Sequence, residues 1–448
     1  MQVAQELKVE EKEEITLQEK VVSFFIYLSV FLGSSIVFFK QPFEGYFHYV
    51  IYLGLLPFFI RQFGLPKTPF KLLMVPLVVG VFQIAIGNNE PFLFVKIFGG
   101  VLLSVSVFYY VCEYYNYNIE KMFKLYLTWA YWSAVIAVFQ YVCYKVGFSA
   151  GYNYGWILNK AGGCVVSGDG NIRVASYYLE PSQLGIMLGP AAFVSAINIF
   201  RRRNYHYKKY MNYVILLALY LSRSSTGYLG LFLVLLIVGI NYGYVLYLML
   251  FIVVSGFAAW GLYNTVGDFR DRVDSSIGLW VHGDLSLKNV NSSSFVLYNN
   301  SHIAWENLKE HPFFGTGLGS HAVAYKKFTY TKDSKIRLQG FEFNTADANS
   351  MFLRFMSETG LIGVVFIISL MMRGFVGYTG DDDDTYWVIS GALLVIILLY
   401  LLRQGNYFLN GFPIFAWMYY YNRMNYLENL EEKRLAREEA ERRAAMRY

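Results

Sequence analysis

Charged residues and cysteines are scarce in this sequence. Asp, Glu, Lys and Arg make up only 16% of the 448 residues, whereas soluble domains carry roughly 25%. The three cysteines, Cys112, Cys143 and Cys164, form an odd and scattered set without metal-site spacing. Hydrophobic residues reach 56% and aromatic residues 19%. Together these values exclude a soluble enzyme, a disordered chain and a small disulfide-stabilised domain.

Long apolar runs recur along the chain. A helix needs about 20 apolar residues to cross the roughly 30 Å hydrocarbon core of a bilayer. The sequence therefore predicts an all-α polytopic membrane protein with about 12 transmembrane helices. The predicted spans are 21–39, 46–60, 70–86, 91–111, 124–146, 182–200, 211–222, 228–240, 243–262, 351–371, 386–402 and 407–421.

The run 211–240 is interrupted by a polar segment, Ser222–Gly227. A guanidinium at the centre of a single span would cost roughly 2.5–3.5 kcal/mol on insertion scales. Irregular backbone at membrane depth is tolerated where protein or water surrounds it. We therefore interpret 211–240 as a broken hairpin of two short helices, with Arg223 at the break.

Basic residues indicate the orientation of these helices. The N-terminal segment 1–20 lacks the basic region of a signal peptide. Twelve spans with a cytoplasmic N-terminus place the cluster 201–209 and the charged tail 422–448 on the inner side together, although Lys40 then lies outside. Transmembrane helices 1–9 then occupy 21–262, and helices 10–12 occupy 351–421.

Two polar segments fall on the outer face under this topology. The first is the loop 147–180, and the second, 263–350, is long enough to form a large, mainly helical extracytoplasmic loop. Residues Asn300–His311 show helical spacing. The following run Gly315–Gly319 does not follow a strand of a βαβ unit and lacks a P-loop lysine, so it indicates a tight turn rather than a nucleotide loop.

Cations in and near these outer segments are the candidate ligands for an anionic substrate. Arginine stays charged and matches phosphate oxygens with paired donors. The ordinary alternative for each is a lipid-headgroup contact or a structural ion pair. The candidates are Arg173, Arg223, Arg270, Arg272, Arg354 and Arg403.

Two residues could act as a general base. Glu180 precedes Pro181 at a predicted helix start, where a carboxylate also simply stabilises the helix. His302 lies on one face of the predicted outer helix and could accept a proton or a hydrogen bond. The four histidines of 263–350 do not have the spacing of a zinc site, so no metal is expected.

Four segments carry a resemblance to the O-antigen polymerase and ligase superfamily. His311–Gly319, read HPFFGTGLG, resembles its hPlfGvGlG segment, and Asp347–Gly363 resembles its HNxxLxxxxExGxxG segment. Ser222–Gly227 is similar to its SRSGT break, and Glu180-Pro181-Ser182 resembles an EPS element of the polymerase branch. The resemblance covers about residues 170–365 and gains weight because the four segments occur in the family's order on one polytopic chain.

The resemblance implies a glycosyltransferase in a bacterial cytoplasmic (inner) membrane, acting on the periplasmic or extracellular face. Its donor and acceptor would be undecaprenyl-pyrophosphate-linked oligosaccharides in the lipid bilayer, and its product O-antigen, capsule or a related polysaccharide. It implies no cofactor, no metal and no nucleic acid, because the leaving group is already a pyrophosphate. A chain-length regulator is a possible partner.

The resemblance also suggests roles for residues. Arg173, Arg223 and Arg354 would stabilise the departing pyrophosphate, and Glu180 or His302 would accept the proton of the attacking hydroxyl. Asn349 stands where the ligase branch has a histidine, and an amide cannot take a proton, which favours a Wzy-type polymerase. The alternatives are an O-antigen ligase, a membrane glycosyltransferase of the peptidoglycan-polymerase type, and a lipid-glycan transporter or flippase.

Overall fold

The protein is mostly helical in a computed structural model, which describes residues 16–41, 43–160, 165–166, 172–265, 267–285, 292–332, 342, 344–380 and 384–446. Among these residues, six helices are long and apolar enough to cross a membrane. They are α3 (Lys67–Ala85), α4 (Pro91–Tyr114), α5 (Ile119–Lys145), α7 (Pro181–Arg201), α14 (Met351–Gly374) and α15 (Thr385–Arg403).

The other six predicted spans also coincide with helices. Helices α1, α2, α8 and α9 are shorter than 18 residues, α16 is polar over much of its length, and α10 counts as an apolar helix only over Met249–Thr265. The crossing of a membrane by all twelve therefore stays a prediction. They are α1 (Leu17–Leu32), α2 (Phe47–Phe63), α8 (Lys209–Ser222), α9 (Ser225–Asn241), α10 (Val245–Thr265) and α16 (Phe412–Ala445).

One of the predicted span boundaries is wrong. The first span was expected to reach residue 39, but α1 ends at Leu32, and β1 (Val37–Phe39) instead pairs antiparallel with β2 (Gly45–Tyr46). The last predicted span and the charged tail lie in one helix, since α16 runs without a break from Phe412 to Ala445. The charged tail is therefore the extension of the last apolar helix, because its Glu, Lys, Arg and Ala residues all favour helix.

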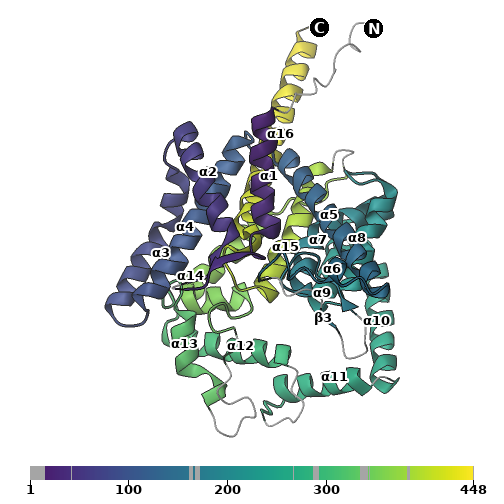
Figure 1. Ribbon diagram of the computed structural model, residues 1–448. Coiled ribbons are helices and arrows are strands. Elements are labelled where there is room, and N and C mark those ends of the chain that lie inside the picture. Colours follow the sequence, from purple (N-terminus) through teal and green to yellow (C-terminus); the bar gives the residue numbers. More distant parts are fainter. Residues whose placement is uncertain are drawn as a thin grey trace.

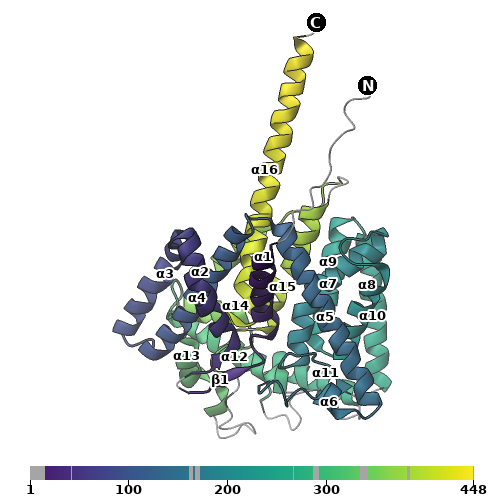
Figure 2. The ribbon, with the colours of Figure 1, turned by 45° about the horizontal axis from the view of Figure 1, so that its top comes forward.

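The two ends of the helical bundle differ (Figure 1). At one end lie α11 (Gly267–Trp280), α12 (Ser292–Glu310) and α13 (His321–Phe328), and we call this the cap end. From the opposite end, here called the tail end, α16 projects (Figure 2). The predicted helix Asn300–His311 is confirmed as the second half of α12, apart from its last residue.

The described residues of the loop 147–180 lie at the cap end as well. It contains α6 (Ser149–Tyr152) and a second small sheet, in which β3 (Val165–Val166) pairs with β4 (Ile172–Arg173). These two sheets are the exceptions to the predicted all-α architecture within the described residues.

The predicted interruption of 211–240 is confirmed. Arg223 ends α8 with a left-handed backbone (φ 46°, ψ 34°), and Ser224 begins α9 by accepting a hydrogen bond from the amide of Gly227 on its hydroxyl. Helix α7 packs against both α8 and α9. Gly185 makes this packing possible, because a Cβ there would lie 2.8 Å from the Cα of Gly227.

Helix α14 is also broken, at Gly360 (φ 61°, ψ −158°). The turn Gly315–Gly319 fills the break, as the left-handed φ of Gly315 and Gly317 allows. The amide of Gly317 donates to the carbonyl of Glu358 (2.8 Å), and the amide of Leu361 donates to the carbonyl of Pro312 (2.8 Å). The predicted tight turn is thus confirmed, and it supplies backbone partners that a broken apolar helix needs.

Candidate active site

Five of the residues predicted for the site lie at the cap end of neighbouring helices. Glu180 is the last residue before α7, and its exposed carboxylate accepts a hydrogen bond from Ser182 Oγ (2.9 Å). Arg403 ends α15, which packs along α7, and the charges of Arg403 and Glu180 interact favourably. The structure therefore joins a carboxylate and a guanidinium that are far apart in the sequence.

Arg173 and Arg223 form the second part of this group. Arg173 ends β4, and the amide of the next residue, Val174, donates to the carbonyl of Leu221 at the end of α8 (3.3 Å). Arg223 follows α8 directly and is exposed. Both guanidinium groups lie close enough to the Tyr228 hydroxyl to interact with it electrostatically. Two positive charges thus gather beside the broken hairpin.

Asn349 approaches the same end of the bundle from α14. Its backbone is left-handed (φ 55°), and its amide donates to Asp347 Oδ1 (3.1 Å). The next residue, Ser350, donates from its hydroxyl to the carbonyl of Leu401 near the end of α15 (2.7 Å). We call Arg173, Glu180, Arg223, Asn349 and Arg403 the cap-end cluster.

His302 does not point toward this cluster. Its ring stacks on Tyr330 (centroids 4.1 Å apart, 18° between planes), and its Nδ1 lies 3.8 Å from Glu306 Oε1. Ala304, on the other face of α12, packs against Ala348 beside Asn349. Burial is the main cause that lowers the pKa of His302, which favours the neutral imidazole.

Arg270 and Arg272 lie on α11, away from the cluster. Arg270 is exposed, and it donates to the carbonyls of Tyr263 and Asn264 at the end of α10 (both 3.0 Å). These contacts satisfy carbonyl groups that a helix end leaves free. The side chain of Arg272 lies outside the described residues.

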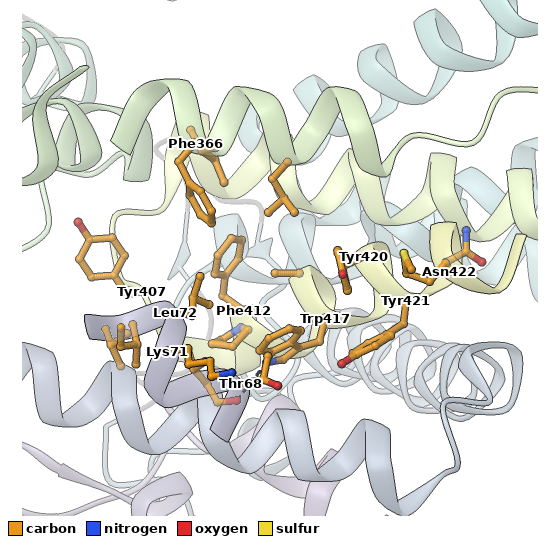
Figure 3. A pocket seen from close by; sticks show the side chains of 18 of the residues that line it. Thr68, Lys71, Leu72, Phe366, Tyr407, Phe412, Trp417, Tyr420, Tyr421 and Asn422 are labelled. Atoms are coloured by element: carbon orange, nitrogen blue, oxygen red, sulfur yellow. Dashed lines mark hydrogen bonds between the residues drawn. The ribbon is translucent and has the colours of Figure 1, made fainter. Parts of the chain in front are cut away.

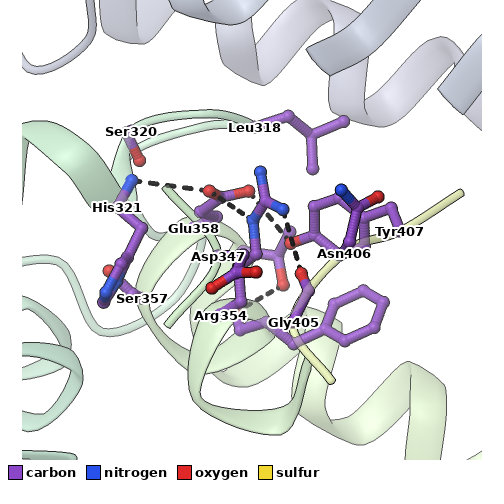
Figure 4. Close-up of polar contacts among 12 residues, drawn as sticks. Leu318, Ser320, His321, Asp347, Arg354, Ser357, Glu358, Gly405, Asn406 and Tyr407 are labelled. Carbon is purple, nitrogen blue, oxygen red and sulfur yellow. Dashed lines mark hydrogen bonds and ion pairs between the residues drawn. The ribbon is translucent and has the colours of Figure 1, made fainter. Parts of the chain in front are cut away.

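Arg354 is buried in a polar network (Figure 4). It is 1% exposed and pairs with Glu358, which is 0% exposed, over 2.9 Å. Its Nη1 donates to the carbonyl of Gly405 (2.9 Å), and its guanidinium lies over the ring of Tyr407 at 4.2 Å. In this structure Arg354 is thus an internal ion-pair partner rather than an exposed cation.

The partners of Arg354 in this network are not among the residues predicted from the sequence. Glu358 also accepts hydrogen bonds from the Tyr407 hydroxyl (2.9 Å) and the His321 amide (3.4 Å). His321 Nε2 lies 3.0 Å from Asn300 Oδ1, and burial together with the charge of Arg354 lowers the pKa of His321 to about 3. The i,i+4 spacing of Arg354 and Glu358 was the available sequence signal.

A large cavity of about 1490 Å³ runs from the cap end toward the tail end (Figure 3). Its walls come mostly from α3, α14 and α16 and are chiefly apolar. Glu358 and Tyr407 lie at its cap end, and Thr68 and Asn425 at its tail end. The volume exceeds the roughly 300–1,000 Å³ of ordinary small-molecule pockets.

These observations define a multi-pass helical membrane protein with a cationic cluster at one end of its bundle. Residues 211–368 match the Wzy_C family, described as O-antigen ligase. The matched segment begins in α8, contains the break at Arg223 and the helices of the cap end, and ends inside α14. The match supports membership of the O-antigen ligase and polymerase superfamily, as the four sequence segments implied. No curated protein matches the chain.

Proposed function

We propose that this protein is a Wzy-type polymerase that joins lipid-linked repeat units into a surface polysaccharide. The donor is a glycan on undecaprenyl pyrophosphate, and the acceptor is the non-reducing sugar of a second lipid-linked unit. In this proposal the cap end faces the outside of a bacterial inner membrane, where such glycans are assembled. The family match supports transfer chemistry of this superfamily and does not support a transporter.

The cap-end cluster is the observation that carries the proposal. As the bond between the anomeric carbon and the pyrophosphate breaks, negative charge gathers on the leaving diphosphate. Arg173, Arg223 and Arg403 offer fixed positive charge at the place where the substrate head group would lie, and preorganised donors of this kind lower the barrier. The side-chain amide of Asn349 can donate hydrogen bonds to the same diphosphate oxygens.

Glu180 is the base that this geometry favours. The acceptor hydroxyl forms the new bond to the anomeric carbon and gives up its proton, and a carboxylate in the cluster can take it. Glu180 is exposed and lies beside Arg403, so it can meet the hydroxyl next to the leaving group. The lowered pKa of His302 favours a neutral imidazole, which could serve as a base. Its ring stacks on Tyr330, however, and this contact holds it away from the cap-end cluster.

The cavity suits the hydrocarbon tail of one of the substrates. It lies at the depth of the apolar helices, its walls are mostly aliphatic and aromatic, and its cap end reaches Glu358 below the cluster. Because bilayer lipid is as apolar as these walls, van der Waals packing rather than removal from water would hold an isoprenoid chain there.

An O-antigen ligase is the second candidate, because the matched family carries that description. A ligase would share the donor and the cationic cluster but would pass the finished glycan to a different acceptor. Asn349 favours the polymerase, since it occupies the position of the ligase histidine and an amide cannot accept a proton. A chain-length regulator is an expected partner of the polymerase.

The decisive experiment uses purified full-length protein and a synthetic undecaprenyl-pyrophosphate-linked repeat unit, without nucleotide sugar or added metal. We expect a ladder of longer lipid-linked glycans from the wild type, and little product from Arg223→Ala, with Arg61→Ala, on the exposed tail end of α2, as the matched control. Transfer of intact glycan only to a lipid core or a protein acceptor would indicate the ligase. Normal rates in Arg223→Ala would remove the cluster from the mechanism.

A further inference from the structure

The buried ion pair of α14 lies between the apolar cavity and the cap-end cluster. Glu358 and Tyr407 line the cavity, whereas Arg354 turns from Glu358 toward the backbone at Gly405 (Figure 4). Burying two charges is costly unless their geometry and their further hydrogen bonds are good. The burial of the pair therefore costs free energy of folding. The hydrogen bonds of Arg354 and Glu358 show which segments of the chain the pair holds in place.

Glu358 holds three segments of the chain together. Its Oε1 accepts from Arg354 Nε (2.9 Å) within α14 and from the amide of His321 (3.4 Å) at the start of α13. Its Oε2 accepts from the hydroxyl of Tyr407 (2.9 Å), between α15 and α16. Hydrogen bonds to a charged acceptor are stronger than neutral ones, so this carboxylate restrains all three segments.

Arg354 extends the connection to the cluster. Its Nη1 donates to the carbonyl of Gly405, two residues after Arg403. The backbone of Gly405 touches that of Asp347, since a Cβ on Gly405 would lie 1.4 Å from the Asp347 carbonyl oxygen. Asp347 in turn accepts from the amide of Asn349 (3.1 Å), and its charge interacts with that of Arg354.

We propose that Glu358 and Arg354 are positioning residues for the glycosyl transfer. Through Gly405 and Asp347 they fix Arg403 and Asn349 where these side chains meet the diphosphate of the lipid-linked substrate. This inference rests on the proposed function, because it takes Arg403 and Asn349 to be substrate ligands. Neither Glu358 nor Arg354 needs to touch the reacting atoms.

The geometry demands a guanidinium at position 354. One planar fork donates from Nε to Glu358 and from Nη1 to Gly405 at the same time, both over 2.9 Å. A lysine ammonium is a single point charge and lacks this rigid fork. Arg354→Lys therefore keeps the charge balance of the pair while it loses the link to Gly405.

The test compares Arg354→Lys, Glu358→Gln and the double variant Arg354→Gln/Glu358→Gln. The double variant is expected to fold, since replacing a buried ion pair as a whole is often tolerated, whereas a lone buried charge is not. Each protein is assayed with the synthetic undecaprenyl-pyrophosphate-linked repeat unit, and its thermal unfolding is followed in the same detergent. The matched control is the exposed i,i+4 pair Glu439–Arg443 on α16, changed to two glutamines.

We expect kcat to fall roughly 100-fold in Arg354→Lys and in the double variant, the loss that a misplacement of about 1 Å can cause. KM should change much less, because the cavity that holds the tail is intact. The loss of kcat in the double variant should be smaller than the product of the losses in Arg354→Lys and Glu358→Gln, because the two residues act through one shared network. The Glu439/Arg443 variant should keep wild-type kinetics.

Wild-type kcat in Arg354→Lys or in the double variant, at unchanged unfolding temperature, would overturn the proposal. The proposal would also be overturned if, in every variant, the loss of kcat equalled the loss of folded protein. Such a result would show that the pair has a structural role alone. A wild-type protein that transfers no glycan would refute the proposed function itself and this inference with it.

Discussion

Gly360 is the position where one methyl group should disturb the protein most. Its backbone (φ 61°, ψ −158°) lies in a region that is essentially restricted to glycine, and holding another residue there costs about 1–3 kcal/mol. The Cβ of an alanine would also lie 2.7 Å from the amide nitrogen of Gly315 and from the backbone of Phe313. Such overpacking adds about 1–3 kcal/mol.

The two costs together predict that Gly360→Ala lowers the free energy of unfolding by about 2–6 kcal/mol. If the segment Pro312–Gly317 moves away instead, four backbone hydrogen bonds between it and α14 are lost, and each is worth about 0.5–1.5 kcal/mol, which gives a similar sum. Either way the change is large against a total stability of about 5–15 kcal/mol.

Thermal unfolding of the purified protein in detergent, followed by intrinsic tryptophan fluorescence, measures this effect. The matched control is Gly99→Ala in α4, where no atom lies within 4 Å of the added Cβ, so its stability should stay the same or rise slightly. An unfolding temperature of Gly360→Ala equal to that of the wild type would refute the account of how the turn completes α14.

Three further predictions concern pH, the cluster and the cavity. His321 has a pKa of about 3 in the folded protein against about 6.5 when unfolded, so the unfolded state gains the proton first. The free energy of unfolding should therefore fall as the pH drops from about 6.5 toward 3. The unfolding temperature of His321→Asn should depend less on pH than that of the wild type. The same pH dependence in both proteins would contradict this prediction. Arg403→Ala should lower kcat roughly 10²–10³-fold, as the loss of one donor to a developing anion does elsewhere, measured with the lipid-linked repeat unit; an unchanged kcat would exclude Arg403 from the diphosphate site. Val75→Trp should fill part of the cavity and raise KM for a long-chain lipid substrate, whereas Val78→Trp on the same exposed helix but outside the cavity should not; equal KM values would mean that the tail binds elsewhere.

The helices themselves could be predicted because their cause is local. A run of about 20 apolar residues forms a helix in a bilayer or inside a helical bundle. The twelve predicted runs coincide with twelve helices of the structure. The break at Arg223 could also be predicted, since an arginine amid apolar residues and a following Ser-Ser-Thr-Gly are both local signals. The charged end of α16 is helical for a local reason too, because its Glu, Lys, Arg and Ala residues favour helix although they are too polar for a membrane span.

The candidate site depends on contacts between distant residues, and only the tertiary structure decides these. Composition marks Arg354 and Arg223 alike as cations among apolar residues, but Arg354 is buried against Glu358, whereas Arg223 is exposed beside Arg173. Likewise the sequence offers both Glu180 and His302 as bases and cannot say which one faces the arginines. The spacing of residues along one helix fixes which of them share a face, but the packing of α7 against α15, and of α12 against α14, determines what each face meets.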